Sequence, residues 1–481
     1  MASFNKQSVR EEFDKIKASF DEQVKSGKVS PETAALFNTL IMLFGIILSV
    51  FMEKLTKKNS ANSSIPPSQT GLDETAINNS KKGRAKGNGE AKVTIIGNTR
   101  TVETVTLLNV VACENCGHDL SKAECECVER RTRIDIVFEK TAEHFDAEVK
   151  KCDECGELTK ASFPKEIAGP LQYGNGIKAY VIQLLVAQML SLGRAAQMVA
   201  SLIGQVISEA TLLSYIMRLH LALADWEDSA KTQLLASMCI HTDETSLKVD
   251  KKNQWIHVYS AGDITLRLLH QKRGIEAVEE FGIIPAYGGI IVHDCWASYL
   301  SYKHLKHGLC GSHLLRELQF TIDAHGYRWA KNMKRLLRLA CKMVSIAEDK
   351  CLSTETNAKL ERLYKKIILD GGNELPPIPE KSSGKRGKIA KSDAHNLWER
   401  LNIHQNAVLM FANNPHVAFT NNRAERDLRM TKVKQKISGC FRTEKYARAY
   451  CRISSYLQTM NNKGVNPLVA VSWALSGKFE V

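Results

Sequence analysis

The segment 237–296 decides the fold. It reads SMCIHTDETSLKV (237–249), WIHVYSA (255–261), ITLRLLHQ (264–271), GIEAVEEFG (274–282) and YGGIIVHDCW (287–296). The first three stretches are short, rich in β-forming residues and separated by turn residues, so they predict three strands. The fourth stretch predicts a short helix and the fifth a buried strand. The segment as a whole therefore predicts a β-β-β-α-β unit.

Two acidic residues lie on this unit. Asp243 is near the middle of the first predicted strand, and Asp294 ends the last one. A carboxylate that ends an apolar strand is costly unless it is solvated, paired or bound to a metal. If the first and fourth strands lie side by side, both carboxylates can face one cleft, where a divalent cation would offset their repulsion. Glu244 is the alternative to Asp243, because strand alternation points the two side chains to opposite faces.

A third acidic candidate lies far downstream, in NNRAERDLR (421–429). Asn421 or Asn422 would cap a helix that carries Glu425 in its first turn, and Asp427 is the alternative acid. The basic residues around it suit a metal site that binds DNA phosphates, although a solvated helix with intrahelical ion pairs more often has this pattern. These candidate DNA contacts are Arg423, Arg426, Arg429 and Lys432.

The 13 cysteines indicate metal binding more than disulfides. The opening MASFNKQSVREEFDK is too charged for a secretory signal, so we expect a reducing cytoplasm. Two CxxC pairs, each followed by glycine and separated by 35 residues, predict one structural zinc site with four thiolates. The pairs are Cys113 with Cys116 and Cys152 with Cys155. An extra CxC, Cys125 and Cys127, either replaces a ligand or remains free, and four free cysteines are the alternative to any zinc site.

The first 55 residues predict two helices. Apolar residues recur at helical spacing over 8–26, which indicates an amphipathic helix. The segment 34–51 is apolar and uncharged over 18 residues, the lower limit for a membrane span. Leu36, Leu40, Leu43 and Ile47, however, follow a 4-3-4 spacing that suits a helix buried in an oligomer. We expect a homo-oligomer, with a membrane anchor as the alternative.

Composition and patterning predict a multidomain α+β protein. Lys and Arg outnumber Asp and Glu by 66 to 52, and the resulting formal charge of +14 favours a polyanionic partner. The predicted parts are a helical oligomerisation region (1–55), a flexible basic linker (56–92), a zinc-binding module (93–160), a helical region (161–235) and a catalytic domain (236–475) with a helical insertion at about 312–392.

The motifs resemble, in order, those of the transposase family of insertion sequence 66, a family of DDE transposases. The resemblance runs from about Asn62 to Pro467. HTDETSLKV, VHDCWASY and NNRAERDLR are similar to its three catalytic motifs, and LCGSHLLREL to the Cys-x-x-His segment after the second. The paired CxxC segment resembles its zinc-binding domain, SSIPPS its linker, and FPKEIAGPLQYGNGIKA the start of its helical region. The chain departs from the family at Cys295, where Gly is usual after the acid.

The resemblance implies an RNase H-like catalytic core in which Asp243, Asp294 and Glu425 hold Mg²⁺ or Mn²⁺. It implies cleavage of element ends and strand transfer into target DNA. DNA, further copies of the chain and small accessory proteins are the implied partners. Cys310 and His313 either position the scissile phosphate or form a packed Cys beside a hydrogen-bonded His. Arg316 is a further candidate DNA contact.

Two other functions remain open at this point. One is an RNase H-like structure-specific nuclease, which would hydrolyse strands without joining them. The other is a catalytically inactive zinc DNA-binding protein derived from a transposase.

Overall fold

The computed structural model describes residues 6–63, 104–134, 139–164, 167, 169–378 and 391–478. The chain divides into two compact units, which are described separately. The first unit contains residues 1–91 and 228–444, and the second contains 92–227 and 445–481. Most of the linker predicted at 56–92 lies outside the described residues, as does 379–390 of the predicted insertion.

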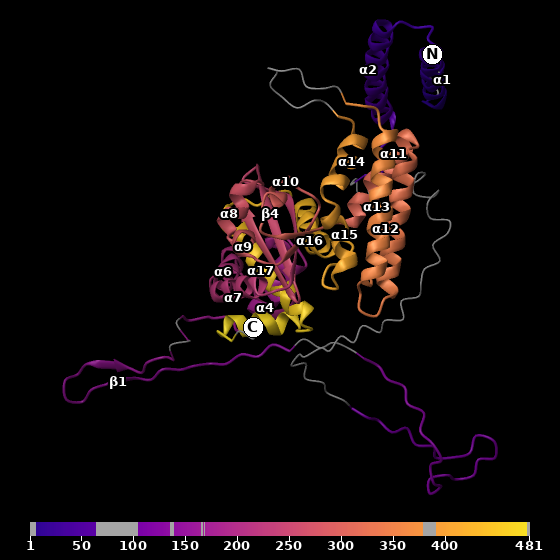
Figure 1. Ribbon diagram of the computed structural model, residues 1–481. Coiled ribbons are helices and arrows are strands. Elements are labelled where there is room, and N and C mark those ends of the chain that lie inside the picture. Colours follow the sequence, from indigo (N-terminus) through magenta and orange to yellow (C-terminus); the bar gives the residue numbers. More distant parts are fainter. Residues whose placement is uncertain are drawn as a thin grey trace, which may run out of the picture. The chain divides into compact units, whose positions relative to one another are not determined.

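The first unit is built on a five-stranded mixed sheet of order β5-β4-β3-β6-β7. Figure 1 shows this sheet with its strand β4 labelled. The strands are β3 (Cys239–Val249), β4 (Lys252–Ala261), β5 (Ile264–His270), β6 (Ile290–His293) and β7 (Lys306–Leu309). β3, β4 and β5 pair antiparallel, whereas β6 runs parallel to β3 and β7 parallel to β6. Helices α8 (Ile275–Phe281) and α9 (Ile283–Ala286) lie between β5 and β6. The predicted β-β-β-α-β order is confirmed, and the fourth strand pairs with the first. β7 was not predicted, because four residues reading KHGL carry no strand pattern.

The turn between β3 and β4 is a two-residue hairpin. Asp250 and Lys251 both have positive φ, at 46° and 61°, and Val249 pairs with Lys252 across them. Two consecutive residues in this region fit a type I′ turn, whose twist matches that of the strands it joins. The turn fixes the register of β3 against β4 and therefore the faces to which Asp243 and Glu244 point.

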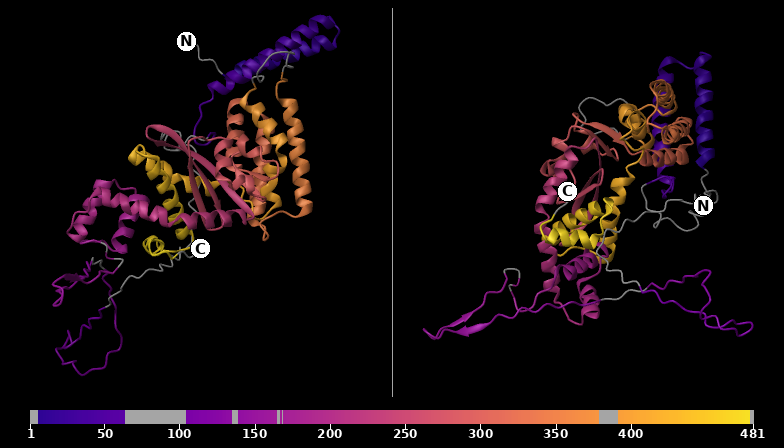
Figure 2. Two further views of the ribbon diagram at one scale, coloured as in Figure 1. Left: turned by 90° about the vertical axis from the view of Figure 1, so that its left-hand side faces the viewer. Right: turned by 90° about the horizontal axis from the view of Figure 1, so that it is seen from below.

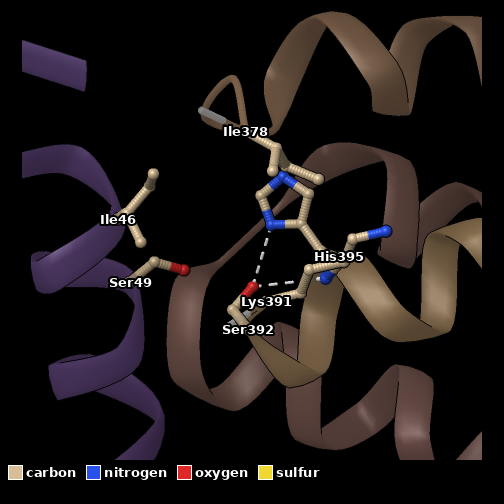
Figure 3. A pocket seen from close by; sticks show the side chains of 6 residues that line it. All are labelled: Ile46, Ser49, Ile378, Lys391, Ser392 and His395. Carbon is tan, nitrogen blue, oxygen red and sulfur yellow. Dashed lines mark hydrogen bonds between the residues drawn. The ribbon is translucent and has the colours of Figure 1, made fainter. Parts of the chain in front are cut away.

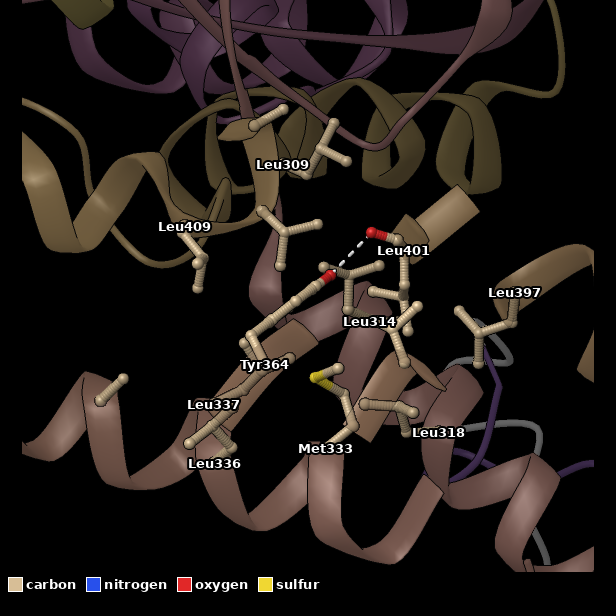
Figure 4. Close-up of a cluster of buried hydrophobic side chains, with 14 of the residues drawn as sticks. Leu309, Leu314, Leu318, Met333, Leu336, Leu337, Tyr364, Leu397, Leu401 and Leu409 are labelled. Atoms are coloured by element: carbon tan, nitrogen blue, oxygen red, sulfur yellow. Dashed lines mark hydrogen bonds between the residues drawn. The ribbon is translucent and has the colours of Figure 1, made fainter. Parts of the chain in front are cut away.

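The helices of this unit after β6 are α10 (Ala297–Leu300), α11 (Gly311–His325), α12 (Arg328–Ile346), α13 (Thr354–Glu374), α14 (Asp393–Ile403), α15 (Gln405–Asn413) and α16 (Asn422–Ser438). Helices α11 to α15 pack around an apolar core. Leu314 and Leu318 of α11, Met333 of α12 and Leu397 of α14 meet in this core (Figure 4). The buried Tyr364 hydroxyl donates to the Leu401 carbonyl oxygen at 2.8 Å, so its polar atom is satisfied. Most of the described residues of the insertion predicted at about 312–392 are helical, as predicted.

Helix α16 is bound to the sheet through Asp427. This side chain is 3% exposed, and its Oδ2 accepts hydrogen bonds from Ser260 Oγ (2.7 Å) and Thr265 Oγ1 (2.9 Å). The guanidinium of Arg267 donates to the Asp427 carbonyl oxygen through Nε (3.0 Å) and Nη2 (2.6 Å). Asp427 therefore links α16 to β4 and β5, which gives it a structural role and leaves Glu425 as the acid of this helix that is free to face a ligand.

The N-terminal residues of the first unit form a helical hairpin, α1 (Lys6–Lys25) and α2 (Pro31–Leu55), drawn in indigo in Figure 2. Ser30 caps α2 by accepting a hydrogen bond from the Thr33 backbone N–H at 3.3 Å. Both helices lie where the sequence predicted them. By length and composition α2 is apolar enough to span a membrane, and it is the one such helix among the described residues.

The second unit is mainly helical. Its helices are α4 (Asn175–Ile182), continued by a π-helical turn η2 (Gln183–Ala187), α5 (Leu192–Ile203), α6 (Glu209–Ala222), α17 (Glu444–Asn462) and α18 (Pro467–Leu475). Helix α7 (Ala224–Leu235) begins in this unit and ends in the first. Arg452 pairs with Glu227 at 2.8 Å, and the ring of Trp226 meets that of Tyr456 edge-on at 5.2 Å. The unit also contains a small hairpin, β1 (Val149–Lys151) and β2 (Leu158–Lys160).

The role of Asp427 is tested by removing its carboxylate. Asp427→Ala leaves the Ser260 and Thr265 hydroxyls without this acceptor, so we expect the free energy of unfolding to fall by roughly 3 kcal/mol. Urea unfolding followed by tryptophan fluorescence measures the change. Asp370→Ala, at an exposed position on α13, is the matched control and should stay within about 0.5 kcal/mol of wild type. Equal effects of the two substitutions would contradict the structural role.

Candidate active site

The parallel pairing of β3 with β6 brings the first two acids to the same level. The paired residues are Cys239 with Ile290, Ile240 with Ile291 and His241 with Val292, a constant offset of 51 positions. Continuing this register by two residues sets Asp243 beside Asp294, because 243 and 294 also differ by 51. Neighbouring strands lie about 4.8 Å apart. The two carboxylates therefore leave adjacent strands at one level of the sheet.

Asp243 lies in an acidic, partly buried environment. Burial is the main cause that raises the pKa of this carboxyl to about 8. The negative charges of Glu244, Asp294 and Glu425 raise the pKa further, whereas the Glu244 backbone N–H, which donates to Asp243 Oδ1 at 2.8 Å, lowers it. Asp294 and Glu425 thus act electrostatically on Asp243, although Glu425 is 182 positions away in the chain. Asp294 and Glu425 are therefore near enough to influence the charge of Asp243, although the three carboxylates do not form one compact ligand group among the described residues.

Glu244, the alternative to Asp243, has a positive partner. Its Oε1 accepts from Arg273 through Nε (2.9 Å) and Nη2 (2.6 Å), and its Oε2 accepts from the Tyr299 hydroxyl at 3.1 Å. The Arg273 guanidinium also lies over the rings of Trp255 (5.0 Å) and Trp296 (4.7 Å). This ion pair neutralises Glu244, whereas the side chains that shift the pKa of Asp243 are all acidic. Asp243 is therefore the acid that calls for an external cation.

Glu425 lies in the first turn of α16, as predicted, with about a third of its side chain exposed. Its Oε1 is 3.6 Å from His313 Nδ1 and 3.9 Å from Cys310 Sγ. Within the described residues, these three are the group of His, Cys, Asp and Glu side chains whose ligand atoms all lie within 4.8 Å of one another. Burial and the nearby Arg316 lower the pKa of His313, and burial raises the pKa of Cys310. A neutral imidazole and a protonated thiol therefore border Glu425.

Asn421 contacts β3, Cys310 at the start of α11 and Glu425 in the first turn of α16. The sequence predicted it only as one of two candidate caps of α16. It is 1% exposed. Its Oδ1 lies 3.0 Å from His241 Nδ1, and its Nδ2 donates to the Thr242 carbonyl oxygen at 2.8 Å. Its backbone N–H donates to Cys310 Sγ at 3.2 Å, and its carbonyl oxygen accepts from the Glu425 N–H at 3.2 Å. It begins α16 without a side-chain cap, since its amide is used across the fold instead. The asparagine directly before the helix that carries Glu425 was the available signal.

The residue after Asp294 has a backbone conformation that favours glycine. Cys295 has φ of 73°, and its N–H donates to His293 Nδ1 at 3.2 Å. Positive φ is uncommon for residues with a Cβ and adds strain. Glycine, which Sequence analysis gives as usual in the resembled family, would take this conformation freely, whereas nothing in the structure explains the cysteine. His293 is buried, and its Nε2 lies 3.1 Å from His307 Nδ1, as expected for a packing residue.

The predicted DNA contacts divide into bound and exposed groups. Lys432 Nζ donates to the Ser246 carbonyl oxygen at 3.0 Å, and Arg423 Nη2 donates to the Ile264 carbonyl oxygen at 3.2 Å. These two side chains therefore hold α16 against the sheet. Arg426 and Arg429 are exposed on the same helix, and Arg316 lies one turn after His313 on α11. The latter three remain available to phosphate groups.

The two CxxC pairs form matching turns in the second unit. In each, the first cysteine exchanges backbone hydrogen bonds around a glycine of positive φ, Gly117 at 75° and Gly156 at 76°. Backbone N–H groups at Cys116 and Asn115 lower the pKa of Cys113, and those at Cys155 and Glu154 do the same for Cys152. The four thiols do not form one compact ligand group among the described residues, so each turn is by itself a two-thiol half-site. Cys125 and Cys127 are exposed.

Acidic residues on two adjacent strands and on one helix, with exposed arginines on the same helix, are features expected of an enzyme that acts on nucleic acid. Comparison with known families defines it further. Residues 170–449 match a family described as Transposase IS66 family. The match covers 280 of 481 residues, and the chain belongs to the IS66 family of transposases. Membership implies DNA binding and the use of divalent metal ions. A search of curated proteins found no match.

The raised pKa of Asp243 predicts a pH-dependent stability in Mg²⁺-free buffer. The raised pKa keeps a proton on Asp243 in the folded protein up to pH about 8, whereas the unfolded chain loses it near the ordinary aspartate pKa of 3.8. The stabilisation is complete below the unfolded pKa and is lost as the pH rises through the folded pKa. The free energy of unfolding should therefore fall between about pH 4 and pH 8.

Asp243→Asn cannot ionise, so the fall in the free energy of unfolding that comes from this carboxyl should be absent in the variant. The variant should therefore be more stable than the wild type above pH 8. Urea unfolding at a series of pH values measures both. Asp370→Asn should keep the wild-type slope, and a wild-type slope in Asp243→Asn would show that the carboxyl titrates normally.

Proposed function

We propose that this chain is an active DDE transposase that cleaves the ends of its element and joins them to target DNA. The observation that supports this most is the shared neighbourhood of Asp243, Asp294 and Glu425, which come from a strand, a strand end and a helix. We further propose that the sheet is an RNase H-like core, split by the helices α11–α15 before the third acid. Three antiparallel strands followed by two parallel ones support this assignment.

The residues present fit a magnesium or manganese site. Asp243, Asp294 and Glu425 offer only carboxylate oxygens, the ligands that these hard cations prefer. Asp243 has acidic neighbours and no cation among the groups that shift its pKa, so a divalent ion would supply the missing charge. When bound, such ions activate an attacking oxygen and stabilise the leaving one. Cys310 is a poor ligand, because the thiolate binds metals and its raised pKa keeps the thiol protonated.

The remaining residues would bind and orient DNA. Arg316, Arg426 and Arg429 offer bidentate guanidinium groups to backbone phosphates. The neutral His313, beside Glu425, can donate a hydrogen bond to a phosphate oxygen next to the scissile bond. Water attacks phosphorus at the element end, the bond to the 3′ oxygen breaks, and a 3′ hydroxyl is released. That hydroxyl then attacks a target phosphorus in line and displaces the target strand's own 3′ oxygen.

The two CxxC turns would share one structural zinc ion. Each turn already lowers the pKa of its first cysteine, which favours the thiolate that zinc needs. A bound ion would join the two half-sites across the 35 residues between them and so order the module. We expect this module to contact DNA, and the protein to work in the cytoplasm, where its thiols stay reduced.

The triad is tested with isosteric substitutions. Asp243→Asn, Asp294→Asn and Glu425→Gln should each reduce end cleavage and strand transfer by on the order of 10³-fold or more, because each removes a metal ligand. Binding to the element ends should change little, since phosphates are held by Lys and Arg. The assay uses a supercoiled plasmid that carries the ends of the encoding element, with Mg²⁺ or Mn²⁺.

Asp370→Asn serves as the control and should keep full activity. Retained activity in one of the three variants would remove that residue from the triad. Cleavage by the wild-type chain without strand transfer would identify a nuclease instead of a transposase.

The zinc site is tested by elemental analysis of the purified chain. We expect about one zinc per chain in the wild type. Cys113→Ser and Cys152→Ser should each lose the metal and weaken DNA binding, whereas Cys341→Ser, on α12 of the other unit, should keep both. Full zinc content in Cys113→Ser would contradict the proposed ligand set.

A further inference from the structure

Three side chains beside the proposed catalytic acids form a group of a different chemical kind. Cys310 lies directly before α11, His313 is in the first turn of that helix, and Glu425 is in the first turn of α16. They offer one sulfur, one nitrogen and one carboxylate oxygen, and these atoms all lie within 4.8 Å of one another. Asp243 and Asp294, which offer only oxygen, are not members of this group. Its donor set therefore differs from that of the proposed magnesium site.

The distances within this group suit a tetrahedral zinc ion. With Zn–N and Zn–O bonds of about 2.0–2.1 Å and a Zn–S bond of about 2.3 Å, tetrahedral angles separate nitrogen from oxygen by about 3.3 Å and sulfur from oxygen by about 3.5 Å. Glu425 Oε1 is 3.6 Å from His313 Nδ1 and 3.9 Å from Cys310 Sγ. Small movements of these side chains would therefore close the three ligands around such an ion.

The ring of His313 has a nitrogen atom that lacks a partner. Its Nδ1 is shielded from solvent and, among the described residues, has no hydrogen-bond partner. His395 of α14, which lines a small pocket (Figure 3), has the usual arrangement. The Nδ1 of that ring lies 3.0 Å from Ser392 Oγ, and its Nε2 lies 2.7 Å from the Pro376 carbonyl oxygen. Buried polar atoms without a partner are rare, and a metal ion would be the partner that His313 Nδ1 lacks.

The sulfur of Cys310 is surrounded by backbone donors. The Asn421 N–H donates to it at 3.2 Å. Burial raises the pKa of this thiol, whereas the backbone N–H groups of Asn421, His313 and Ser312 lower it. Donors of this kind stabilise a thiolate, which is the form that binds zinc. The empty site keeps the thiol protonated, but Zn²⁺ displaces the proton when it binds, whereas Mg²⁺ and Mn²⁺ prefer oxygen ligands.

Gly311 fixes Cys310 close to the segment that leads into α16. Its N–H donates to the Phe419 carbonyl oxygen at 2.8 Å. A Cβ at this position would overlap the ring of Phe419, so the approach requires glycine. Asn421 follows Phe419 by two residues and begins α16. The two segments that carry the three ligands are therefore held together by the protein itself.

We propose that Cys310, His313 and Glu425 bind one Zn²⁺ ion and leave its fourth position to water or to a phosphate oxygen. Three protein ligands with one exchangeable ligand are usual for open zinc sites. Cys310 is buried, whereas the side chains of His313 and Glu425 are 22% and 32% exposed, so the ion can be reached from solvent. Its charge would offset that of Glu425, one of the acids that act on Asp243. The site shares Glu425 with the catalytic proposal but does not depend on it.

The test titrates Co²⁺, a spectroscopic substitute for Zn²⁺, into the full-length chain. Three protein ligands bind less tightly than four thiolates, so we expect the site to fill when metal is added. The wild type should gain a thiolate-to-cobalt charge-transfer band that Cys310→Ser lacks. Thiolates of the CxxC turns contribute equally to both chains, so the difference spectrum isolates this site. Cys341→Ser, a substitution elsewhere in the same unit, should keep the wild-type spectrum. Added Zn²⁺ should displace the cobalt and remove the band.

Two further variants separate loss of a ligand from loss of folding. Glu425→Gln and His313→Ala keep the thiol, and each should weaken cobalt binding at least about tenfold, the loss already typical of removing an outer partner of a metal site. Glu425→Gln, which preserves the shape of the side chain, should unfold at no lower urea concentration than the wild type without metal. Asp294→Asn removes a proposed catalytic acid but no member of this group, so it should keep the band.

The absence of a Cys310-dependent band in the wild type would overturn the proposal. Wild-type cobalt affinity in both Glu425→Gln and His313→Ala would overturn it as well. Because the titration contains no DNA, its outcome is distinct from that of the cleavage assay. A chain that binds cobalt in this way but cleaves no element end would refute the catalytic proposal alone.

Discussion

The parallel pairing of β3 with β6 is the contact on which the candidate site depends. It sets strands that are 51 positions apart side by side, and its register brings Asp243 level with Asp294. A slip of one residue would turn one of the two acids to the opposite face of the sheet. The two-residue turn after Val249 and the antiparallel pairing with β4 hold β3 against such a slip. Two carboxylates are thus fixed on adjacent strands in a partly buried place. Burial and mutual repulsion make their ionised forms unfavourable unless a cation is bound.

The third acid depends on how α16 is held. Asp427 binds α16 to β4 and β5, Lys432 binds it to β3, and Asn421 binds its beginning to Thr242 beside Asp243. Glu425 follows Asn421 by one helical turn, so the same asparagine that contacts β3 sets the height of the acid. Several polar residues of α16 therefore attach it to the sheet, whereas Arg426 and Arg429 are left exposed.

The charge balance around β3 distinguishes two adjacent acids. Glu244 has Arg273, held between two tryptophans, as its counter-charge, and Asp243 has acids. Neighbouring residues of one strand can differ in this way because they face opposite sides of the sheet.

The helix α2 of the N-terminal hairpin also has faces with different surroundings. One face of α2 packs on α1, its C-terminal end packs on α11 and α14, and a third face is exposed.

Strand alternation, helical spacing and turn residues predicted the strands up to β6 and most of the helices, because these patterns are local. Motif spacing and the family resemblance pointed to Asp243, Asp294 and Glu425, whereas local patterns alone left Glu244 and Asp427 as alternatives. The structure gives both alternatives partners within the protein, Arg273 for Glu244 and Ser260 and Thr265 for Asp427, which favours Asp243 and Glu425 as the candidates. It also revealed Asn421 as a link between three elements and added β7, a strand too short to show a pattern. These hydrogen bonds and ion pairs join residues from 29 positions apart (Glu244 and Arg273) to 180 positions apart (His241 and Asn421), and no local pattern encodes such partners.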